Sequence, residues 1–433
     1  MKITFINHAS AIIQHKNIRL IMDPWFEGYA FADGWALLSK GDFSSKDFDT
    51  VTHIWFSHEH PDHFCPPILQ KIPIEVRKKI TVLFHKTIDK KVIQFCNKMS
   101  FGEVIEIEPD KPFDIGDGLK IICNPYFDGD SWAYFYTNEI GILNLNDCIV
   151  RTQEEANEIK QKIGKVDVLM TQFGYANKLG EPTEDYIRRD AALEKLHRIY
   201  NQASSIQPTY IIPFASFVFF CHEENFYMNQ GQNTVRNAFD FIKKELPCIP
   251  VVMYPDQDWN LFDDWDSAIA LNKYEKDYAA IKSYPLVTAQ KVDIENLKKE
   301  ALTFSDRLIR KNSTAKHLIN SIRPKIFLTD YNSAFEFLGE AGIKQISTLQ
   351  KNCDVALSSQ ALSYIFKHEW GGGTFNVNGR FLIPEGGDFY RFNLFIRMGV
   401  MNNNGLEYKW SRPGLFERIG SKLKSLISKR NVS

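Results

Sequence analysis

Three histidines and two acidic residues are concentrated within six consecutive positions of this chain. The run follows the apolar stretch 51–56 and reads Ser57-His58-Glu59-His60-Pro61-Asp62-His63. Alternate side chains of an extended segment share a face, so His58 and His60 can hold one ion. Pro61 then turns the chain and directs Asp62 and His63 toward a second ion. Imidazole and carboxylate ligands suit zinc, iron or manganese, and the run therefore predicts a site for one or two divalent metal ions.

A helical zinc motif is the competing interpretation of this run. In that motif, two histidines four positions apart lie on one face of a helix. Here the position four after His58 is Asp62, and Pro61 would break the helix. The remaining alternative is a chance cluster of surface histidines. We expect a loop that follows a strand to carry these side chains.

Two later residues are further candidates, because one short run cannot fill two coordination spheres. Asp147 follows the apolar stretch 141–145 and His222 follows the stretch 210–217, so each lies where a strand leads into a loop. A carboxylate at such a position is well placed to bridge two ions. By residue type alone, a capping aspartate and a satisfied core histidine are the commoner interpretations.

The spacing His-x-His-x-Asp-His at positions 58–63 resembles the signature of the metallo-β-lactamase superfamily. The resemblance implies an α/β fold of the αββα sandwich type, with two sheets between helical layers. More narrowly, the chain looks like the metallo-β-lactamase-like part of CMP-N-acetylneuraminate hydroxylases over residues 1–230. The segments that carry this likeness are 23–35, 142–148 and 213–222.

His8 lies in a shorter segment, Asn7-His8-Ala9, that is similar to the Gly-His-Ala segment of the ascorbate-6-phosphate lactonase-like branch. This similarity implies a residue near the substrate or behind the metal ligands, and a histidine that merely ends a strand is the alternative. A group of aromatic residues could wall a ligand pocket or belong to the core. The group consists of Trp25, Phe26, Tyr29, Phe31 and Trp35.

The resemblance favours a functional role for Asp147 and His222, and it implies how the ligands are shared between two ions. The first ion would be held by His58, His60 and Asp147. The second ion would be held by Asp62, His63, Asp147 and His222. We expect Asp62 and Asp147 to take part directly in catalysis.

The chain departs from the superfamily pattern at one ligand of the first ion. The superfamily usually supplies a third histidine, but no histidine occurs between His85 and His197. The loop 124–130 takes that place, and Asp128 or Asp130 could ligate instead. We include Asp128 in the predicted ligand set. A carboxylate there would tilt the site toward iron or manganese over zinc, and the alternative is a weak or empty first site.

A second departure concerns iron–sulfur chemistry. The sialic acid hydroxylases carry a Rieske domain, which needs two paired sets of cysteine and histidine ligands. This sequence has no Cys-x-His or Cys-x-x-His pair, since Cys221 and His222 are adjacent. If the chain is an oxygenase, we expect a separate redox partner to supply the electrons.

Short β-prone stretches alternate with helical ones over the first two thirds of the chain, which predicts helices packed on sheets. The predicted strands are 3–6, 11–14, 18–23, 51–56, 81–84, 104–107, 119–122, 141–145, 166–170 and 210–213. The predicted helices are 88–99 and 188–202. Prolines interrupt the pattern near residue 285, so we expect a metal-binding domain at 1–285 and a smaller α+β domain at 286–433.

In the smaller domain we expect helices at 315–322 and 358–367, and a hairpin turn at Asn378-Gly379. A last amphipathic helix is expected over 415–427, either covering the protein's own core or docking on a membrane or partner. This domain contains only His317 and His368 as histidines, so we place the chemistry in the first domain.

The overall composition limits the kinds of partner that we expect the protein to bind. The 52 basic and 53 acidic residues nearly cancel, which argues against binding to nucleic acid. No signal peptide and no apolar run long enough to span a membrane is seen, so we expect a cytoplasmic location. The seven cysteines are scattered singly and suit a reducing compartment as free thiols.

Our first hypothesis is a metal-dependent hydrolase in which a metal-bound hydroxide attacks a phosphoester, lactone or amide of a small metabolite. The second is an iron-dependent oxygenase of a nucleotide sugar or related metabolite, with a separate electron donor. The third is a scaffold that keeps a structural metal. The cofactor would be one or two divalent ions, zinc or iron, with manganese as a further option.

Overall fold

The computed structural model describes residues 1–409, apart from the side chain of Asp128, and the helix expected over 415–427 lies outside the described residues. The chain forms two compact units. The first contains Met1–Gln290 and also Gly373–Leu382. The second contains Lys291–Gly372 and the described residues from Ile383 onward.

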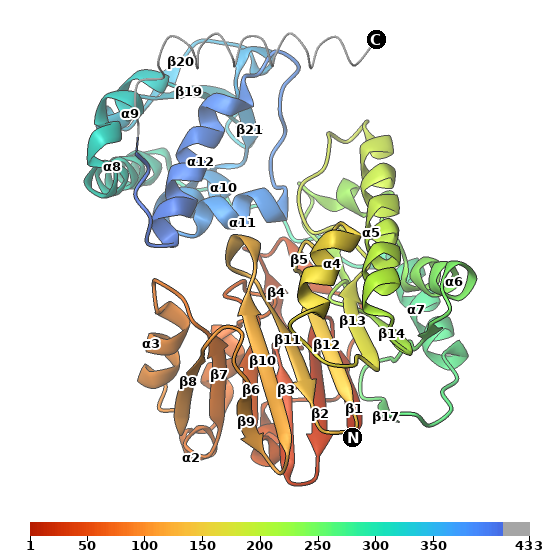
Figure 1. Cartoon of the computed structure of the whole chain (residues 1–433). Coiled ribbons are helices and arrows are strands. Elements are labelled where there is room, and N and C mark those ends of the chain that lie inside the picture. Colours follow the sequence, from red (N-terminus) through yellow and green to blue (C-terminus); the bar gives the residue numbers. More distant parts are fainter. Residues whose placement is uncertain (410–433) are drawn as a thin grey trace. The chain divides into compact units, whose positions relative to one another are not determined.

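Two seven-stranded sheets form the centre of the first unit (Figure 1). The first sheet has the order β17 (Asp258–Asn260), β1 (Lys2–Asn7), β2 (Ser10–His15), β3 (Ile18–Met22), β6 (His53–Phe56), β7 (Thr81–His85) and β8 (Glu103–Ile107). The second has the order β16 (Ile249–Pro250), β14 (Tyr210–Phe214), β13 (Val168–Gln172), β12 (Gly141–Asn146), β11 (Ser131–Tyr136), β10 (Leu119–Pro125) and β9 (Phe113–Gly116). In each sheet an antiparallel half continues into a parallel half.

Alternation of apolar side chains along the strands explains why the first sheet is covered on both faces. In β6, Trp55 packs with the second sheet, where its ring lies 5.6 Å from that of Phe135. The neighbouring Ile54 and Phe56 point to the opposite face and join a separate apolar cluster. Successive strand residues face opposite sides of a sheet. A strand in which every residue is apolar is therefore buried on both faces of the sheet.

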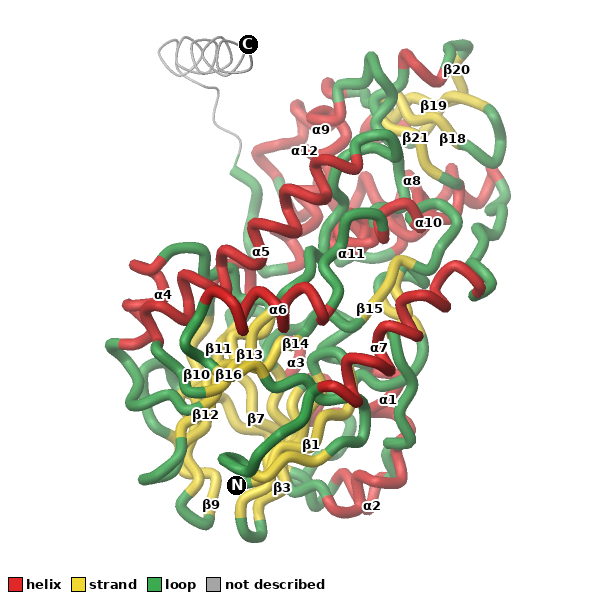
Figure 2. The backbone as a smooth tube through the Cα atoms, turned by 90° about the vertical axis from the view of Figure 1, so that its right-hand side faces the viewer, coloured by secondary structure: helices red, strands yellow, loops and turns green. Residues whose placement is uncertain are grey.

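Helices supply the two outer layers of the sandwich. Side chains of α1 (Pro66–Lys71) and α3 (Lys91–Lys98) belong to the cluster on the outer face of the first sheet. The outer face of the second sheet is covered by α4 (Gln153–Lys160), α5 (Asp185–Ile206) and α6 (Val235–Glu245). Figure 2 shows α1 and α2 (Ile74–Arg77) on the side of β1 and β3 that is away from β10 and β12. This order of layers confirms the predicted αββα sandwich.

The first unit is completed by a small sheet and one further helix. The small sheet has the order β15 (Val218–Phe220), β5 (Trp35–Leu37) and β4 (Tyr29–Ala30), and the helix is α7 (Ala268–Ala280). The helix predicted at 188–202 is α5, which starts earlier, at Asp185, and ends later, at Ile206. The polar residues of its first turns hide the apolar period there, so the sequence pattern underestimated its length.

The second unit is α+β, as expected for the C-terminal part. Its sheet has the order β20 (Ile343–Ile346), β19 (Ser333–Phe337), β18 (Lys325–Leu328) and β21 (Val355–Leu357). Its helices are α8 (Ile294–Lys311), α9 (Lys316–Ile322), α10 (Ser359–Lys367) and α12 (Phe389–Asn403), and α11 (Gly371–Asn378) joins it to the segment Gly373–Leu382. Whether 1–285 and 286–433 fold as separate domains stays a prediction.

The hairpin predicted at Asn378-Gly379 is wrong. Gly379 has a φ of +63° and directly follows the last residue of α11. Its backbone N–H donates to the carbonyl of Phe375 at 3.2 Å, which closes the helix. An Asn-Gly pair tolerates left-handed backbone equally well in a hairpin and at a helix end, and the helix end is what the chain uses here.

All seven cysteines are free and buried, as expected. Among residues 1–409 there is no helix with the length and apolar character needed to cross a membrane.

Candidate metal centre

The predicted ligands come from loops that follow the ends of several strands in the two central sheets. The run from His58 to His63 follows β6, Asp147 follows β12, Asp130 ends the loop before β11, and His8 lies in the turn between β1 and β2. Since β3 and β6 run parallel, Asp23, which follows β3, reaches the same end of the sheet as the histidine run. Parallel strands bring the residues that follow them together, which is why ligands distant in sequence meet here.

Strained backbone marks the strand ends around this site. His8, Asp23, Asn146 and Ala215 have φ values of +40°, +40°, +41° and +46°, a region that residues with a side chain rarely adopt. The N–H of Ala215 donates to the carbonyl of His8 at 3.0 Å, which ties two of these strand ends together. Such strain is kept only where the surroundings fix it, and it is concentrated at functional sites.

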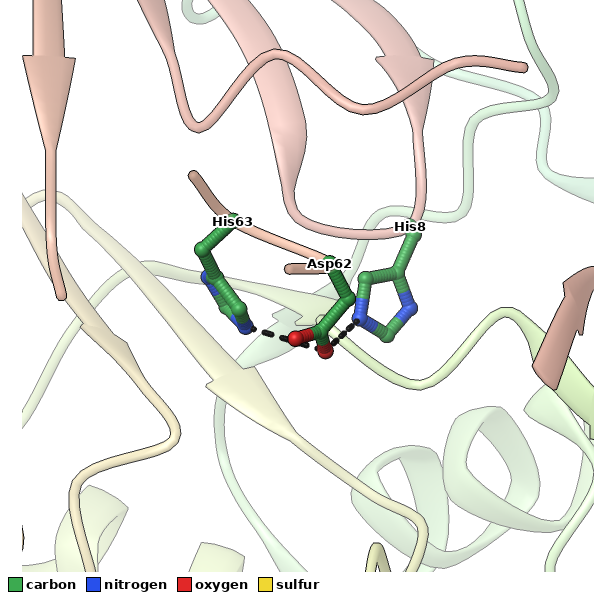
Figure 3. Close-up of side chains that lie close together, drawn as sticks. All are labelled: His8, Asp62 and His63. Atoms are coloured by element: carbon green, nitrogen blue, oxygen red, sulfur yellow. Dashed lines mark hydrogen bonds and ion pairs between the residues drawn. The ribbon is translucent and has the colours of Figure 1, made fainter. Parts of the chain in front are cut away.

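A buried cluster is formed by His8, Asp62, His63 and Asp147. Figure 3 shows the first three pointing toward one another. Asp62 Oδ2 lies 3.2 Å from His8 Nε2 and 3.4 Å from His63 Nε2. His63 Nε2 also lies 3.4 Å from Asp147 Oδ2. Of the four side chains, only that of Asp147 is appreciably exposed, at 17%, so it is the one through which solvent or substrate can reach the cluster.

Asp23 lies behind this cluster and fixes the histidines. Its Oδ2 accepts hydrogen bonds from His63 Nδ1 at 2.9 Å, from Ser57 Oγ at 2.6 Å and from Asn146 Nδ2 at 2.7 Å. A carboxylate only accepts, so His63 carries a proton on Nδ1, and Nε2 is the nitrogen that faces the site. Ser57 Oγ donates its proton to Asp23 and therefore accepts from His58 Nδ1 at 3.0 Å, which leaves His58 Nε2 as a lone pair.

A second, more open cluster is formed by His58, His60 and Asp130. His58 Nε2 lies 2.8 Å from His60 Nδ1 and 3.4 Å from Asp130 Oδ1. His58 is buried, whereas His60 is half-buried. His58 also forms a ligand group with His63 and Asp147, so the two clusters are adjoining parts of one centre.

Charge in the buried cluster is balanced on His63. Burial by itself lowers the pKa of His63, but the carboxylates of Asp62, Asp147 and Asp23 outweigh it and hold that pKa well above the usual value. Burial by itself raises the pKa of Asp62, but His63 and His8 outweigh it and hold the pKa well below its usual range. Burial and the neighbouring His63 and His60 keep the pKa of His58 well below normal, so that ring stays neutral, the form that binds metals.

The donor set fits a divalent cation. Within the described residues, Asp62 Oδ1 and His63 Nε2 are buried and make no hydrogen bond. A buried polar atom without a partner costs free energy, and a cation held between these atoms would remove that cost. Asp23 lies behind His63 and accepts a hydrogen bond from its Nδ1, which completes the carboxylate–histidine arrangement typical of metal ligands.

His222 lies apart from these ligand groups. None of the groups found among residues 1–409 includes it. Its Nε2 is buried without a hydrogen bond, and its Nδ1 lies 3.4 Å from Glu224 Oε2, which accepts from Arg380 Nε at 2.7 Å. Arg380 belongs to the segment Gly373–Leu382 of the same unit. The Nδ1 of His222 also accepts from the backbone N–H of Glu224 at 3.2 Å. His222 as a metal ligand therefore stays a prediction, supported by its buried Nε2 that makes no hydrogen bond.

The missing third histidine has a counterpart in Asp130. Asp130 is the acidic residue of its loop that the structure brings to His58 and His60, while the side chain of Asp128 lies outside the described part. Sequence reasoning did not single out Asp23. A signal was present, since Asp23 directly follows a strand and precedes a proline, but nothing local showed that Ser57 and Asn146 would converge on it.

Aromatic side chains surround the histidines and are mostly buried. The ring of His8 lies 5.5 Å from that of Trp25, and the ring of His60 lies 5.7 Å from that of Phe31. Trp25, Phe31 and Trp35 are almost fully buried, whereas Tyr29 is 56% exposed. Trp25, Phe31 and Trp35, three members of the group predicted as pocket wall or core, thus pack against the site histidines and keep water from their outer side.

Comparison with known proteins adds the family. Residues 2–215 match the family described as a beta-lactamase superfamily domain. A protein named cytidine monophosphate-N-acetylneuraminic acid hydroxylase from Asterias rubens is 27% identical over 248 residues, which are 53% of this chain and 36% of that protein. The chain thus matches about a third of the length of this curated relative.

Two solved structures are similar at low identity. One is a possible metal-dependent hydrolase from Veillonella parvula DSM 2008, with a TM-score of 0.46, 16% identity, and coverage of 60% of this chain and 99% of that one. The other is CmlA, a diiron beta-hydroxylase from Streptomyces venezuelae, with a TM-score of 0.40, 13% identity, and coverage of 60% and 54%. The family match and the observed layers agree: residues 2–215 form a beta-lactamase superfamily domain, and the first unit has the metallo-β-lactamase fold.

Proposed function

We propose that this chain is a metal-dependent hydrolase that cleaves a phosphoester, lactone or amide of a small metabolite. The observation that carries the proposal is the buried cluster of His8, Asp62, His63 and Asp147, in which imidazole nitrogens and carboxylates converge and two buried atoms, Asp62 Oδ1 and His63 Nε2, make no hydrogen bond. Superfamily members are mostly metal-dependent enzymes, which agrees with this donor set.

The ligand assignment is part of this proposal. His58, His60 and Asp130 would hold one ion, and Asp62 and His63 the other, with Asp147 between them. His222 would join the second ion. When bound, the ions would activate a water molecule and stabilise the negative charge that develops on the substrate.

The protein's own residues prepare the site for that chemistry. Asp23 holds Nδ1 of His63 directly and Nδ1 of His58 through Ser57, so that the Nε2 atoms of both rings face the centre. His8 holds Asp62 by a contact of 3.2 Å, which fixes the carboxylate that can take or return a proton. Asp147 is fixed by Gln172, whose Nε2 donates to its Oδ1 at 2.9 Å. Ligands held this firmly need little reorganisation during the reaction.

A second candidate function is an iron-dependent oxygenase that acts on a nucleotide sugar or a related metabolite and receives electrons from a separate protein. Asp130 favours this alternative, because a carboxylate in place of an imidazole makes the first position harder and better suited to iron or manganese. The curated relative from Asterias rubens is named a hydroxylase, and it is matched only in part.

We further propose a small-molecule substrate and a cytoplasmic location. The location is supported by the seven free, buried cysteines, which suit a reducing compartment.

Elemental analysis and turnover assays test the proposed function together. The full chain, purified from media supplied with zinc and iron in turn, should contain bound metal and hydrolyse at least one of bis(p-nitrophenyl) phosphate, p-nitrophenyl acetate or a chromogenic lactone. Removal of the metal by a chelator should abolish that hydrolysis, and readdition should restore it. If the iron-loaded chain hydrolyses none of these substrates but consumes oxygen in the presence of an electron donor, the oxygenase is favoured. A protein without metal would contradict both.

A further inference from the structure

Lys195 is a lysine of α5 whose ammonium group is directed toward the metal centre instead of toward a carboxylate. The side chain is half-buried, and its Nζ donates to Oε1 of Gln172. The other end of the same amide donates to Asp147 Oδ1 at 2.9 Å. One side-chain amide therefore separates Lys195 from the carboxylate that the proposed function places between two ions.

The orientation of the Gln172 amide follows from its two neighbours. Asp147 offers only acceptors, so the NH₂ end of the amide must face it. Lys195 offers only donors, so the carbonyl end must face the ammonium group. This contact uses one of the three donors of Lys195 and leaves its positive charge facing a neutral group.

The charge of Lys195 has no carboxylate partner within hydrogen-bond or ion-pair distance among residues 1–409. Glu194 is the nearest acidic residue on the helix, but it accepts from Arg198 Nε at 2.6 Å and lies 3.8 Å from Arg151 Nε. Arg151 and Arg198 thus share one carboxylate, that of Glu194, and the group keeps a net positive charge even without Lys195. Lys195 adds a further positive charge to this group.

We propose that Lys195 is the anion-binding residue of a substrate subsite beside the metal centre, where it receives a phosphate or carboxylate group of the substrate. The substrate would then carry an anionic group close to the bond that is cleaved. This inference rests on the proposed function, because it assumes that a substrate binds at Asp147.

The charge balance supports this role. Burial, as the largest cause, and the nearby Arg198 together lower the pKa of Lys195 to about 8, against the opposing effect of Asp147. At neutral pH the amine therefore stays largely protonated. Metal ions bound at Asp147 would neutralise that carboxylate, which removes the main negative charge acting on Lys195. An anion from the substrate would replace it and would accept a charge-assisted hydrogen bond from Nζ of Lys195.

A titration with inorganic phosphate tests the subsite. The metal-loaded full chain is compared with Lys195→Met and Lys195→Arg by isothermal titration calorimetry, and metal content is measured on each protein. Phosphate affinity should fall about tenfold or more in Lys195→Met, as expected for the loss of one charge-assisted hydrogen bond. Lys195→Arg keeps the charge and should recover part of the affinity.

Lys86→Met is the matched control, since Lys86 is an exposed lysine that pairs with Glu108 at 2.9 Å on another part of the first unit. It should bind phosphate like the wild-type chain. Phosphate affinity of Lys195→Met equal to wild type, or no phosphate binding by the wild-type chain, overturns the subsite. Loss of metal from Lys195→Met would also overturn it, because Lys195 would then act only by positioning Asp147 through Gln172. Failure of the proposed function is distinguishable, since it would show as a metal-loaded wild-type chain that binds phosphate but hydrolyses nothing.

Discussion

The two halves of the metal centre are built differently. In the buried half, His63 is fixed from behind by Asp23, and Asp62 is fixed from the side by His8. In the open half, Asp23 reaches His58 indirectly, through Ser57, and His60 is half-buried next to the loop that carries Asp130. One half thus has ligands held by buried hydrogen bonds at strand ends, and the other has ligands that depend on a loop.

This difference indicates that the two positions would bind metal unequally. A ligand whose ring is already fixed loses little conformational entropy when it binds a metal, whereas a ligand on a loop must be ordered first. We expect the buried half to hold its ion more tightly and the open half to respond more readily to metal supply.

The largest effect is expected from replacing His58 and His60 together with Ala. His58 belongs to ligand groups in both halves, so the double variant should lose most of its bound metal. Elemental analysis of the purified protein measures this, and circular dichroism checks that the chain still folds. His197→Ala, a change at an exposed histidine of α5, is the control. Metal content like that of the wild type in the double variant would contradict the proposed centre.

Asp23→Asn should weaken the buried half strongly. The amide keeps the shape but has no negative charge, and its NH₂ group cannot accept from the backbone N–H of Ser57 as Oδ1 does at 2.7 Å, so His63 is held less firmly. Loss of such a partner lowers metal affinity by about 10- to 100-fold, and we expect the upper end. Competition with a chelating dye measures it. Asp167→Asn is the matched control, a buried aspartate at the other end of β12 and β13. If the two variants bind metal with equal affinity, Asp23 does not support the metal ligands.

Asp130→Asn should weaken the open half by about tenfold, the lower end of the same range, because His58 and His60 remain. The same competition assay should show one weakened position and one unchanged position, which would separate the two halves directly. The exposed Asp114 serves as control through Asp114→Asn. An Asp130→Asn protein with both affinities intact would mean that Asp130 only caps its turn.

The smallest effect is expected from Arg380→Gln. Arg380 supports Glu224, which in turn faces His222, so the change reaches the centre through two intermediates. We expect metal affinity to fall by less than about tenfold, below the range seen for direct partners of ligands. Arg391→Gln, which affects an exposed pair with Asp388, is the control. A loss as large as that of Asp23→Asn would show that His222 carries more of the binding than the buried cluster.

The sequence predicted the sandwich and the histidine run because both depend on local signals. The ligands at 58–63 are contiguous and follow a strand, so their residue types alone point to a metal. The role of Asp23 depends on Ser57 and Asn146, which are brought to it by strand pairing from other parts of the chain. Lys195 could not be found for the same reason, since its position relative to Asp147 is set by Gln172 at the end of another strand.

Asn378-Gly379 shows the converse limit. Its local signal was strong, but two structures use the same backbone conformation, and only the packing around it decides between them. In place of a second strand, the Asn378 side chain meets the carbonyl of Phe31 at 3.2 Å, and its own carbonyl accepts from Asn225 Nδ2 at 2.7 Å. Both contacts join residues more than 150 positions apart, a separation that no local pattern reports.

The return of Gly373–Leu382 to the first unit sets an order of events during synthesis of the protein. Residues 1–290 leave the ribosome well before Asn378 and Arg380, so the nascent metal-binding half first exists without the groups that contact Phe31, Asn225 and Glu224. Those contacts form only after the strands and helices of Lys291–Gly372 have been made. The segment Gly373–Leu382 is thus the last part of the first unit to be translated. The first unit can be complete only after this segment has been made and has contacted Phe31, Glu224 and Asn225.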